Sequence, residues 1–189
     1  MSARTILVTA VAVATLVIPT IAHGATIRAT SAKEQLLGNL EWESGSTRSY
    51  VNDTDTAVLL PADTMLGQLV AAAAFTGTKL VVSEFAGIGP YVKSLGSQKV
   101  GPKGAWDVYV NGRTPTLGAG VLVLKKHDDV IWFLDDDYSK VGPVILDLAY
   151  RVATDGAVTF TARKASGTGW TPAKGATVMV DGAAVGTTG

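Results

Sequence analysis

The first place in this sequence where side chains could do chemistry is a histidine followed by two carboxylates. His127 precedes Asp128 and Asp129, and an imidazole beside a carboxylate is typical of a metal ligand or an oriented base. Neighbouring residues in a strand point to opposite faces, however, and the sequence after residue 24 holds no second histidine to complete a two-histidine metal site. We therefore interpret the run as a solvated hairpin turn.

The other carboxylates are equally poor candidates for a reactive site. Asp135 to Asp137 lack the glycine and the terminal glutamate of a calcium loop, and their mutual repulsion favours a solvated linker. Glu41 and Glu43 lie two residues apart, but nothing fixes the separation that glycoside hydrolysis requires. No G-x-S-x-G elbow precedes a helix. We therefore expect no enzyme, no catalytic residue and no metal site.

The aromatic residues are the more informative set. A glycine-rich loop at Gly89 leads to Tyr91, and the stretch "GAWDVYVNGRTP" carries Trp106 and Tyr109 on opposite faces of one strand. Core packing is one role for Trp106. Tyr109 either lines a partly wet contact surface or is simply a good strand former. The tentative ligand-binding residues are Gly89, Tyr91, Trp106, Tyr109 and Trp132.

One helix and about six strands must position these residues. Asp63 or Thr64 can cap a helix whose apolar stripe begins at Met65, and Gly77 fits the position just past its end. Strands are expected before the helix at Ala25 to Ser31 and at Leu36 to Trp42, and after it at Lys79 to Ser83, from Tyr91, in the stretch from Gly104 up to the turn at Asn111, at Val121 to Leu124 and at Val130 to Leu134. Asn111-Gly112 suits a tight hairpin turn. The pattern predicts an α+β fold with the helix packed on a small mixed sheet.

Residues 1–24 read as a signal peptide. Arg4 precedes the uncharged apolar run from Ile6 to Ile21, and Ala22-His23-Gly24 fits a cleavage site before Ala25. The run is also long enough for a retained anchor, which stays an alternative. The leader and the alanine-rich composition suggest a bacterial chain that is secreted or displayed on the cell surface. We expect no membrane insertion after cleavage.

The composition of the chain excludes several classes of partner and of chemistry. The chain has 189 residues, 16 basic and 16 acidic residues and no cysteine. The balanced charge gives no strong field for nucleic acid, and the lack of cysteine excludes thiol chemistry and cysteine-ligated zinc. An apolar share of 47% supports an ordered, packed protein.

The composition changes near residue 140, where a second segment begins. Two aspartyl-glycine pairs, Asp155-Gly156 and Asp181-Gly182, lie between β-rich stretches and indicate hairpins. The 50 residues from 140 to 189 are too few for an immunoglobulin-like sandwich of about 100. We therefore expect three parts: 1–24 as the signal peptide, 25–139 as the first domain, and 140–189 as an incomplete β-sandwich. Either the chain continues past Gly189 or its last strands pair with another molecule.

Residues 26–134 resemble the transcobalamin-like C-terminal domain. The resemblance rests on the helix, "GPYVKSLG", "WDVYVNG" and the final stretch from Leu124 to Phe133. Lys126-His127-Asp128-Asp129 stands where that family has a glycine-aspartate turn, and no helical barrel accompanies the domain. The tail resembles an immunoglobulin-like or carboxypeptidase-regulatory-like repeat, as in "PAKGATVMVDG".

The resemblance implies a small α+β domain of exported bacterial proteins, with the Tyr91 loop and the Trp106 strand as the places for a ligand. The sequence thus predicts a non-catalytic binding or display module whose partner is a protein, a glycan or a small molecule. The residues indicate no cofactor. Cobalamin enters only through the resemblance, and a corrinoid or other small ligand is the alternative.

Overall fold

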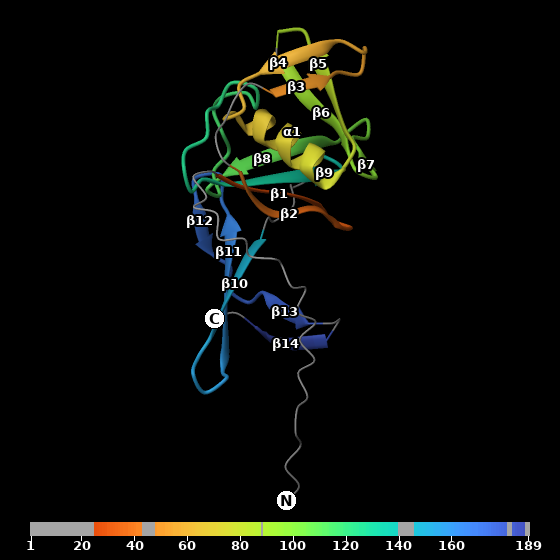
Figure 1. The fold of residues 1–189 in the computed structure, drawn as a ribbon. Helices are drawn as coiled ribbons and strands as arrows, with labels where there is room; N and C mark the ends of the chain where they lie inside the picture. Colours follow the sequence, from red (N-terminus) through yellow and green to blue (C-terminus); the bar gives the residue numbers. More distant parts are fainter. Residues whose placement is uncertain (1–24, 43–47, 88, 140–145, 181–182, 188–189) are drawn as a thin grey trace, which may run out of the picture.

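The computed structural model describes residues 25–42, 48–87, 89–139, 146–180 and 183–187. These residues form one helix and fourteen strands (Figure 1). The helix is α1 (Met65–Thr76), and the strands are β1 (Ala25–Ser31), β2 (Gln35–Trp42), β3 (Arg48–Val51), β4 (Ala57–Leu60), β5 (Leu80–Phe85), β6 (Gly89–Leu95), β7 (Gln98–Lys99), β8 (Ala105–Val110), β9 (Asp129–Asp135), β10 (Leu146–Val152), β11 (Val158–Ala165), β12 (Trp170–Pro172), β13 (Thr177–Val180) and β14 (Ala183–Thr187).

The α+β prediction is wrong, because the fold is rich in strands. About 55% of the described residues are in strands and 8% are in the helix. The strands form several small sheets, and a helix of twelve residues covers only part of one sheet face. The described tail is a three-stranded sheet, β10-β11-β12, and a separate ladder of β13 and β14.

The main sheet has the strand order β2-β1-β9-β8. β1 pairs with β9 in parallel and with β2 in an antiparallel ladder, so β1 is an interior strand although its sequence alternates as an edge strand would. Ala25, Ile27 and Ala29 are buried on the inner face. Arg28 lies on the outer face.

The helix lies on the inner face of this sheet, and its predicted caps are confirmed. The Gly67 amide donates to Thr64 Oγ1 (3.1 Å), and Gly77 adopts the left-handed conformation just past the last turn. Leu66 and Leu69 are fully buried in one core cluster with residues of β1, β2 and β9. Burial of this apolar stripe holds the helix, since twelve residues are marginal as an isolated helix.

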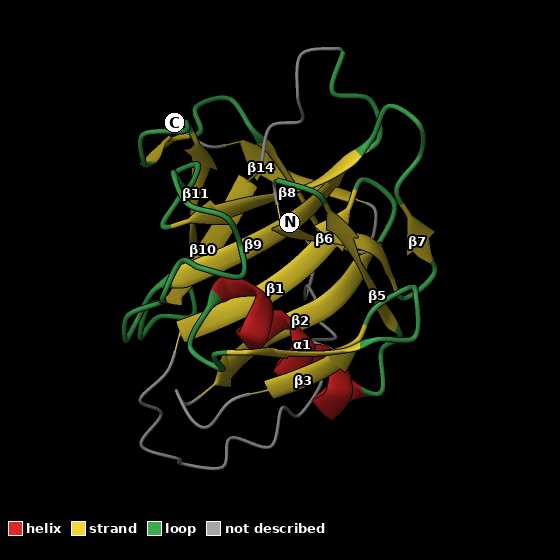
Figure 2. Cartoon of the chain, turned by 90° about the horizontal axis from the view of Figure 1, so that it is seen from above, coloured by secondary structure: helices red, strands yellow, loops and turns green. Residues whose placement is uncertain are grey.

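A second set of strands covers another side of the helix (Figure 2). β6 is the middle strand of the β5-β6-β7 sheet, and a bridge between Asn52 and Val82 joins β5 to the β3–β4 hairpin. Val82, Val92 and Leu95 belong to the same core cluster as the helix. The two sets of strands therefore enclose one core, with β8 and β6 as neighbouring strands of different sheets.

The turn after β8 was predicted correctly, but its hairpin was not. Asn111 and Gly112 both have positive φ, at 54° and 72°. Beyond the turn, only Arg113 pairs back with Val110, and residues 114–124 form a loop instead of the expected strand at Val121 to Leu124. β8 pairs instead with β9.

The tail packs on the outer face of the main sheet (Figure 1). Asp147 of β10 accepts hydrogen bonds from Arg28 (2.7 Å) and from Arg163 of β11 (2.6 Å). Asp129 of β9 lies 3.3 Å from Arg28 and 3.6 Å from Arg163. The Arg163 guanidinium also lies 4.5 Å from the ring centre of Trp170. These four charged side chains tie the tail to β1 and β9.

The predicted leader, residues 1–24, lies outside the described residues, as do Asp181 and Gly182. Among the helices that the structure does describe, none has the length and apolar character needed to cross a bilayer.

Replacing His127 by glycine should stabilise the fold. His127 has a φ of 68° in the turn before β9, a left-handed conformation that costs a non-glycine residue about 1–2 kcal/mol. Part of this gain is lost to the greater freedom of glycine in the unfolded chain. We expect His127→Gly to raise the free energy of unfolding by about 0.5–1 kcal/mol in urea titrations. His127→Ala keeps the strained backbone, so an equal gain in that variant would contradict the explanation.

Asp147→Asn should weaken the attachment of the tail more than Asp129→Asn. Burial acts to raise the pKa of Asp147, but hydrogen bonds from Arg163 and Arg28 outweigh it and lower that pKa. Burial raises the pKa of Asp129, and its two arginines compensate only partly. At neutral pH we expect Asp147→Asn to cost about 2 kcal/mol of unfolding free energy and Asp129→Asn less than about 1 kcal/mol.

The pH dependence of the free energy of unfolding should also distinguish Asp147→Asn from Asp129→Asn. A lowered pKa means that Asp147 stabilises the fold above its unfolded-state pKa, and that this contribution is lost as the pH falls through its lower folded-state value. The raised pKa of Asp129 has the opposite sign, so its ionisation opposes folding at neutral pH. In urea titrations the deficit of Asp147→Asn should shrink in acid. A deficit independent of pH would show that the charge of Asp147 is not its cause.

Candidate ligand pocket between two sheet edges

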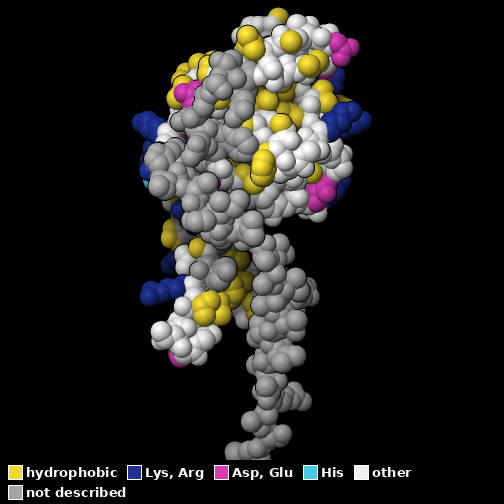
Figure 3. All heavy atoms as spheres, viewed as in Figure 1, with side chains coloured by type: hydrophobic (Ala, Val, Ile, Leu, Met, Phe, Trp, Pro, Cys, Tyr) yellow, Lys and Arg dark blue, Asp and Glu magenta, His cyan; other side chains and the backbone are white. Residues whose placement is uncertain are grey.

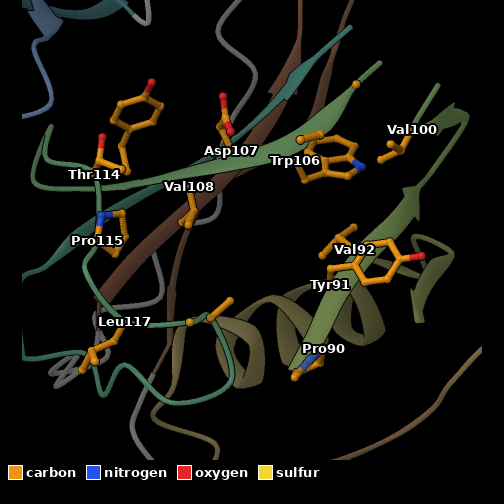
Figure 4. Close-up of a pocket in the computed structure, with 15 residues that line it drawn as sticks. Pro90, Tyr91, Val92, Val100, Trp106, Asp107, Val108, Thr114, Pro115 and Leu117 are labelled. Carbon is orange, nitrogen blue, oxygen red and sulfur yellow. The ribbon is translucent and has the colours of Figure 1, made fainter. Parts of the chain in front are cut away.

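A pocket of about 590 Å³ opens between β6, β8 and the loop that follows β8 (Figure 4). Its size is ordinary for a small-molecule or peptide site. Residues from three segments line it: Pro90, Tyr91 and Val92 of β6 with Val100 beyond it, Gly104 to Tyr109 around β8, and Thr114, Pro115 and Leu117 to Ala119 of the loop. The loop is held against the helix, because the Leu66 amide donates to the Ala119 carbonyl (2.8 Å).

The inner wall of the pocket is aromatic and apolar. Trp106 and Val108 point to the same side of β8, toward Tyr91 and Val92 of β6 (Figure 4). Tyr91 is 39% exposed and meets Phe85 edge-to-face, with ring centres 6.5 Å apart. Apolar side chains gather on the surface over the part of the molecule that holds β3 to β6 (Figure 3). The rim of the pocket is therefore a partly wet aromatic surface of the kind that binds ligands.

The indole of Trp106 packs against the core cluster and leaves its donor unused. Its Nε1 is buried and has no hydrogen-bond partner among the described residues. A buried donor without a partner costs about 1–3 kcal/mol, and most buried tryptophans avoid this cost. Trp132 Nε1 in the core is likewise without a partner among the described residues, so the unused donor of Trp106 does not by itself mark a ligand site.

Backbone groups of β8 also face the pocket. In an antiparallel ladder, alternate residues bond to the partner strand and the residues between them point away. The Asn111 amide donates to the Asp129 carbonyl (2.8 Å), so every second residue before it in β8 also bonds to β9. The backbone groups of Trp106, Val108 and Val110 point to the opposite, free edge. At Val110 this edge is occupied, because its amide donates to the Arg113 carbonyl (2.9 Å) and its carbonyl accepts from the Arg113 amide (3.0 Å). No strand in the described part of the chain pairs with the edge at Trp106 and Val108.

The facing edge of β6 is covered by β7 at Ser94 and Leu95. The rest of that edge, from Pro90 to Val92, is open but less able to pair. The Val82 carbonyl accepts a hydrogen bond from the Asp53 amide, so the backbone groups of Val82 point away from β6. Val92 lies opposite Val82 in the ladder, and its amide and carbonyl therefore point away from β5. Pro90, two residues earlier, points the same way and has no N–H to donate. Proline is a common protection of an exposed edge. The edge of β8 carries no such protection.

A half-buried carboxylate lies on the outer side of β8 at the pocket. Asp107 points to the face opposite Trp106 (Figure 4). Burial, helped by repulsion from Asp135, raises the pKa of Asp107. Burial, with the charges of Asp107 and Asp135, also raises the pKa of Tyr109. No lysine or arginine in the described part of the chain pairs with Asp107. This edge of the pocket therefore favours a cation.

The structure brings three of the five tentative ligand residues to this pocket. Tyr91, Trp106 and Tyr109 line it. The Tyr109 side chain packs against the buried pair Ile131 and Phe133. Ala165 and Trp170 pack against the same pair, so the tail adjoins the face that the sequence left open to solvent. Gly89 begins β6 beside the pocket, with a φ of 95°. Trp132 is 2% exposed in the core and does not line the pocket.

Several lining residues were missed by the sequence analysis. Val108 lies on the same strand face as Trp106, so the alternation of β8 was a usable signal for it. Asp107 was noted on the other face but was not assigned to a site. The loop from Thr114 to Ala119 carries no local pattern that points to a ligand. Its place depends on contacts with the helix and with the tail, where the Thr114 amide donates to the Gly167 carbonyl (3.2 Å).

The acidic residues at both ends of β9 stabilise turns. Asp128 accepts hydrogen bonds from the Lys125 amide and from Asn111 Nδ2, both at 2.7 Å. His127 is exposed in the same turn, as the sequence predicts. Within the described ranges, no three histidine, aspartate or glutamate side chains are grouped as a metal site.

The search of curated proteins finds no match to this chain. The family comparison finds one, and it is described as a domain of unknown function (DUF4430). The match begins within α1 and extends just past β9, so it includes β6, β8 and the loop between β8 and β9. Residues 71–136, which contain all the segments that line the pocket, therefore match the DUF4430 family.

Proposed function

We propose that this protein is an exported, non-catalytic binding and display module that holds its ligand in the pocket between β6 and β8. The observation that carries the proposal is the pocket itself: about 590 Å³ of space beside Tyr91 and Trp106, within the region that matches the DUF4430 family. Its aromatic rim, open strand edge and uncompensated carboxylate are features that a ligand would cover.

The chemistry of the lining residues supports a binding role over a catalytic one. Asp107 is the single carboxylate among them, and no histidine, serine or lysine accompanies it. General acid–base or nucleophilic catalysis needs a base within hydrogen-bond reach of a second reactive group. Thr114, Tyr91 and Tyr109 supply hydroxyl groups, and among the described residues no hydrogen bond joins one of them to Asp107.

Export is proposed from the sequence of residues 1–24. Their charged start, apolar run and small residues before Ala25 have the pattern of a bacterial signal peptide. The absence of cysteine is compatible with export, because the chain buries a continuous core without disulfides. We propose a secreted or surface-displayed protein whose tail, from residue 140, acts as the spacer.

A corrinoid is the alternative ligand. The DUF4430 match covers the helix end, "GPYVKSLG" and "WDVYVNG", on which the resemblance to the transcobalamin-like C-terminal domain rests. In the vitamin carriers that name that family, the domain helps to cover the corrinoid. The pocket offers one aromatic wall for such a contact. Enclosure by a partner molecule would have to supply the rest.

An uncharged apolar dye should bind in the pocket and be sensitive to one exposed leucine but not to another. Leu117 lines the pocket and is 53% exposed, while Leu59 on β4 is 73% exposed and lies outside it. We expect Leu117→Gln to weaken Nile red binding about fivefold, since it removes apolar contact area. Leu59→Gln should change it by less than about twofold. The measurement is fluorescence titration, and equal effects of the two variants would contradict the proposal.

Cyanocobalamin separates the two ligand classes. If the pocket takes a corrinoid, titration of the purified protein should perturb the visible spectrum of the vitamin and raise the melting temperature, because a ligand that binds only the folded state stabilises it. Leu117→Gln should reduce both effects and Leu59→Gln neither. Absence of any spectral or thermal change at high micromolar vitamin would remove the corrinoid alternative and leave the binding module in place.

A further inference from the structure

We propose that the partner of this pocket is an extended polypeptide segment that adds as a strand to the free edge of β8, with a basic side chain opposite Asp107 and apolar side chains on either side. The inference rests on the proposed function and specifies the class of ligand. Strand addition to an exposed sheet edge is a recurrent mode of peptide recognition.

The edge of β8 has backbone groups that are free to pair with a peptide. Trp106 and Val108 direct two amides and two carbonyls to the edge that no described strand covers. The pocket lies along this edge from Gly104 to Tyr109. A strand lies about 4.8 Å from its neighbour and advances about 3.3 Å per residue, so a segment of about three to five residues would span the two open positions at Trp106 and Val108.

The edge of β8 is less protected against pairing than the edge of β6. Natural edges are blunted by proline, by lysine, by a bulge or by a covering loop. Across the pocket, β6 has Pro90. β8 has no proline, lysine or bulge at Trp106 or Val108, and the loop from Thr114 to Ala119 covers this edge only in part. A regular edge with so little protection is a site for pairing with another chain.

The side chains of β8 determine the pattern of the partner. Residues paired across two strands point to the same side of the sheet. Partner residues opposite Trp106 and Val108 would point into the pocket beside Tyr91 and Leu117, which favours apolar side chains. The residue opposite Asp107 would point to the outer face, where Asp107 and Asp135 repel each other without a described cation between them. Lysine or arginine is favoured there.

Two blocked heptapeptides test the sequence preference. Both alternate valine with a charged residue, one with lysine and the other with glutamate, and binding is followed by displacement of Nile red from the purified protein. We expect the lysine peptide to displace the dye at least about tenfold better, because like charges facing each other across an interface cost several kcal/mol. Asp107→Asn should reduce this preference to within about twofold. Asp155→Asn, in the distant turn of the tail, should leave it unchanged.

Backbone methylation tests the strand geometry itself. Two further lysine peptides carry N-methyl groups on every valine or on every lysine. Only one of the two sets points its N–H groups at β8, so exactly one methylated peptide should lose at least about tenfold in affinity. Equal loss from both peptides, or loss from neither, would overturn strand addition. A peptide that binds without regard to charge would also overturn it.

A variant of the protein tests whether the Val108 amide pairs with the peptide. Val108→Pro removes an edge amide that does not bond to β9, and such an edge position tolerates proline. It should lose the lysine peptide, whereas Val108→Thr, which keeps the amide, should retain it. If Val108→Pro fails to fold, the methylated peptides decide. Nile red binding that responds to Leu117→Gln, combined with no peptide binding, would refute this inference and leave the proposed function intact.

Discussion

The burial of one short helix inside a set of strands is the constraint on which the rest of the structure depends. α1 is too short to be stable alone, so Leu66 and Leu69 must be covered by strands from both sets. A sheet that closed fully around the helix would leave no free edge. Here the strands stop short at β8 and β6, and the loop from Thr114 to Ala119 fills only part of the gap. The pocket is the remainder of that incomplete closure.

Local patterns in the sequence were sufficient for the elements that depend on neighbouring residues. The helix ends were predictable, because Thr64 and Gly77 each satisfy orphan backbone groups by their own side-chain or backbone chemistry. The same holds for Asn111 and Gly112, which both accept positive φ. The hairpin around Asp155 and Gly156 was equally visible, and its ladder is regular from Leu146 to Lys164.

Pairings between distant segments were not predictable. β1 and β9 are about 100 residues apart and pair in parallel, and no turn signal marks such a contact. The expected strand at Val121 to Leu124 failed for a related reason: Leu124 is buried and the Leu122 carbonyl accepts from the Met65 amide, so the segment is recruited by the helix start. The fold class was wrong because strands that the sequence analysis did not predict, among them β3, β4 and β7, outweigh the lost one and shift the balance toward β.

In the candidate site, too, local features were predictable from the sequence and long-range contacts were not. Trp106 and Tyr91 were found as aromatic strand residues, whereas the pocket they line depends on which sheet edge remains unpaired. Tyr109 was placed on the correct strand face, but the tail that adjoins this face lies more than 50 residues further along the chain. Trp132 was grouped with the surface aromatics, although its strand lies between β1 and β8 and its ring is in the core.

Gly112 joins the strand that lines the pocket to the tail. A Cβ at this position would lie 2.8 Å from the Trp170 ring, and Arg113 pairs with Thr168 directly beyond it. The turn that ends β8 is therefore shaped by a partner almost 60 residues away as well as by its own two residues. A side chain at position 112 would disturb the seat of Trp170 and the end of β8 together.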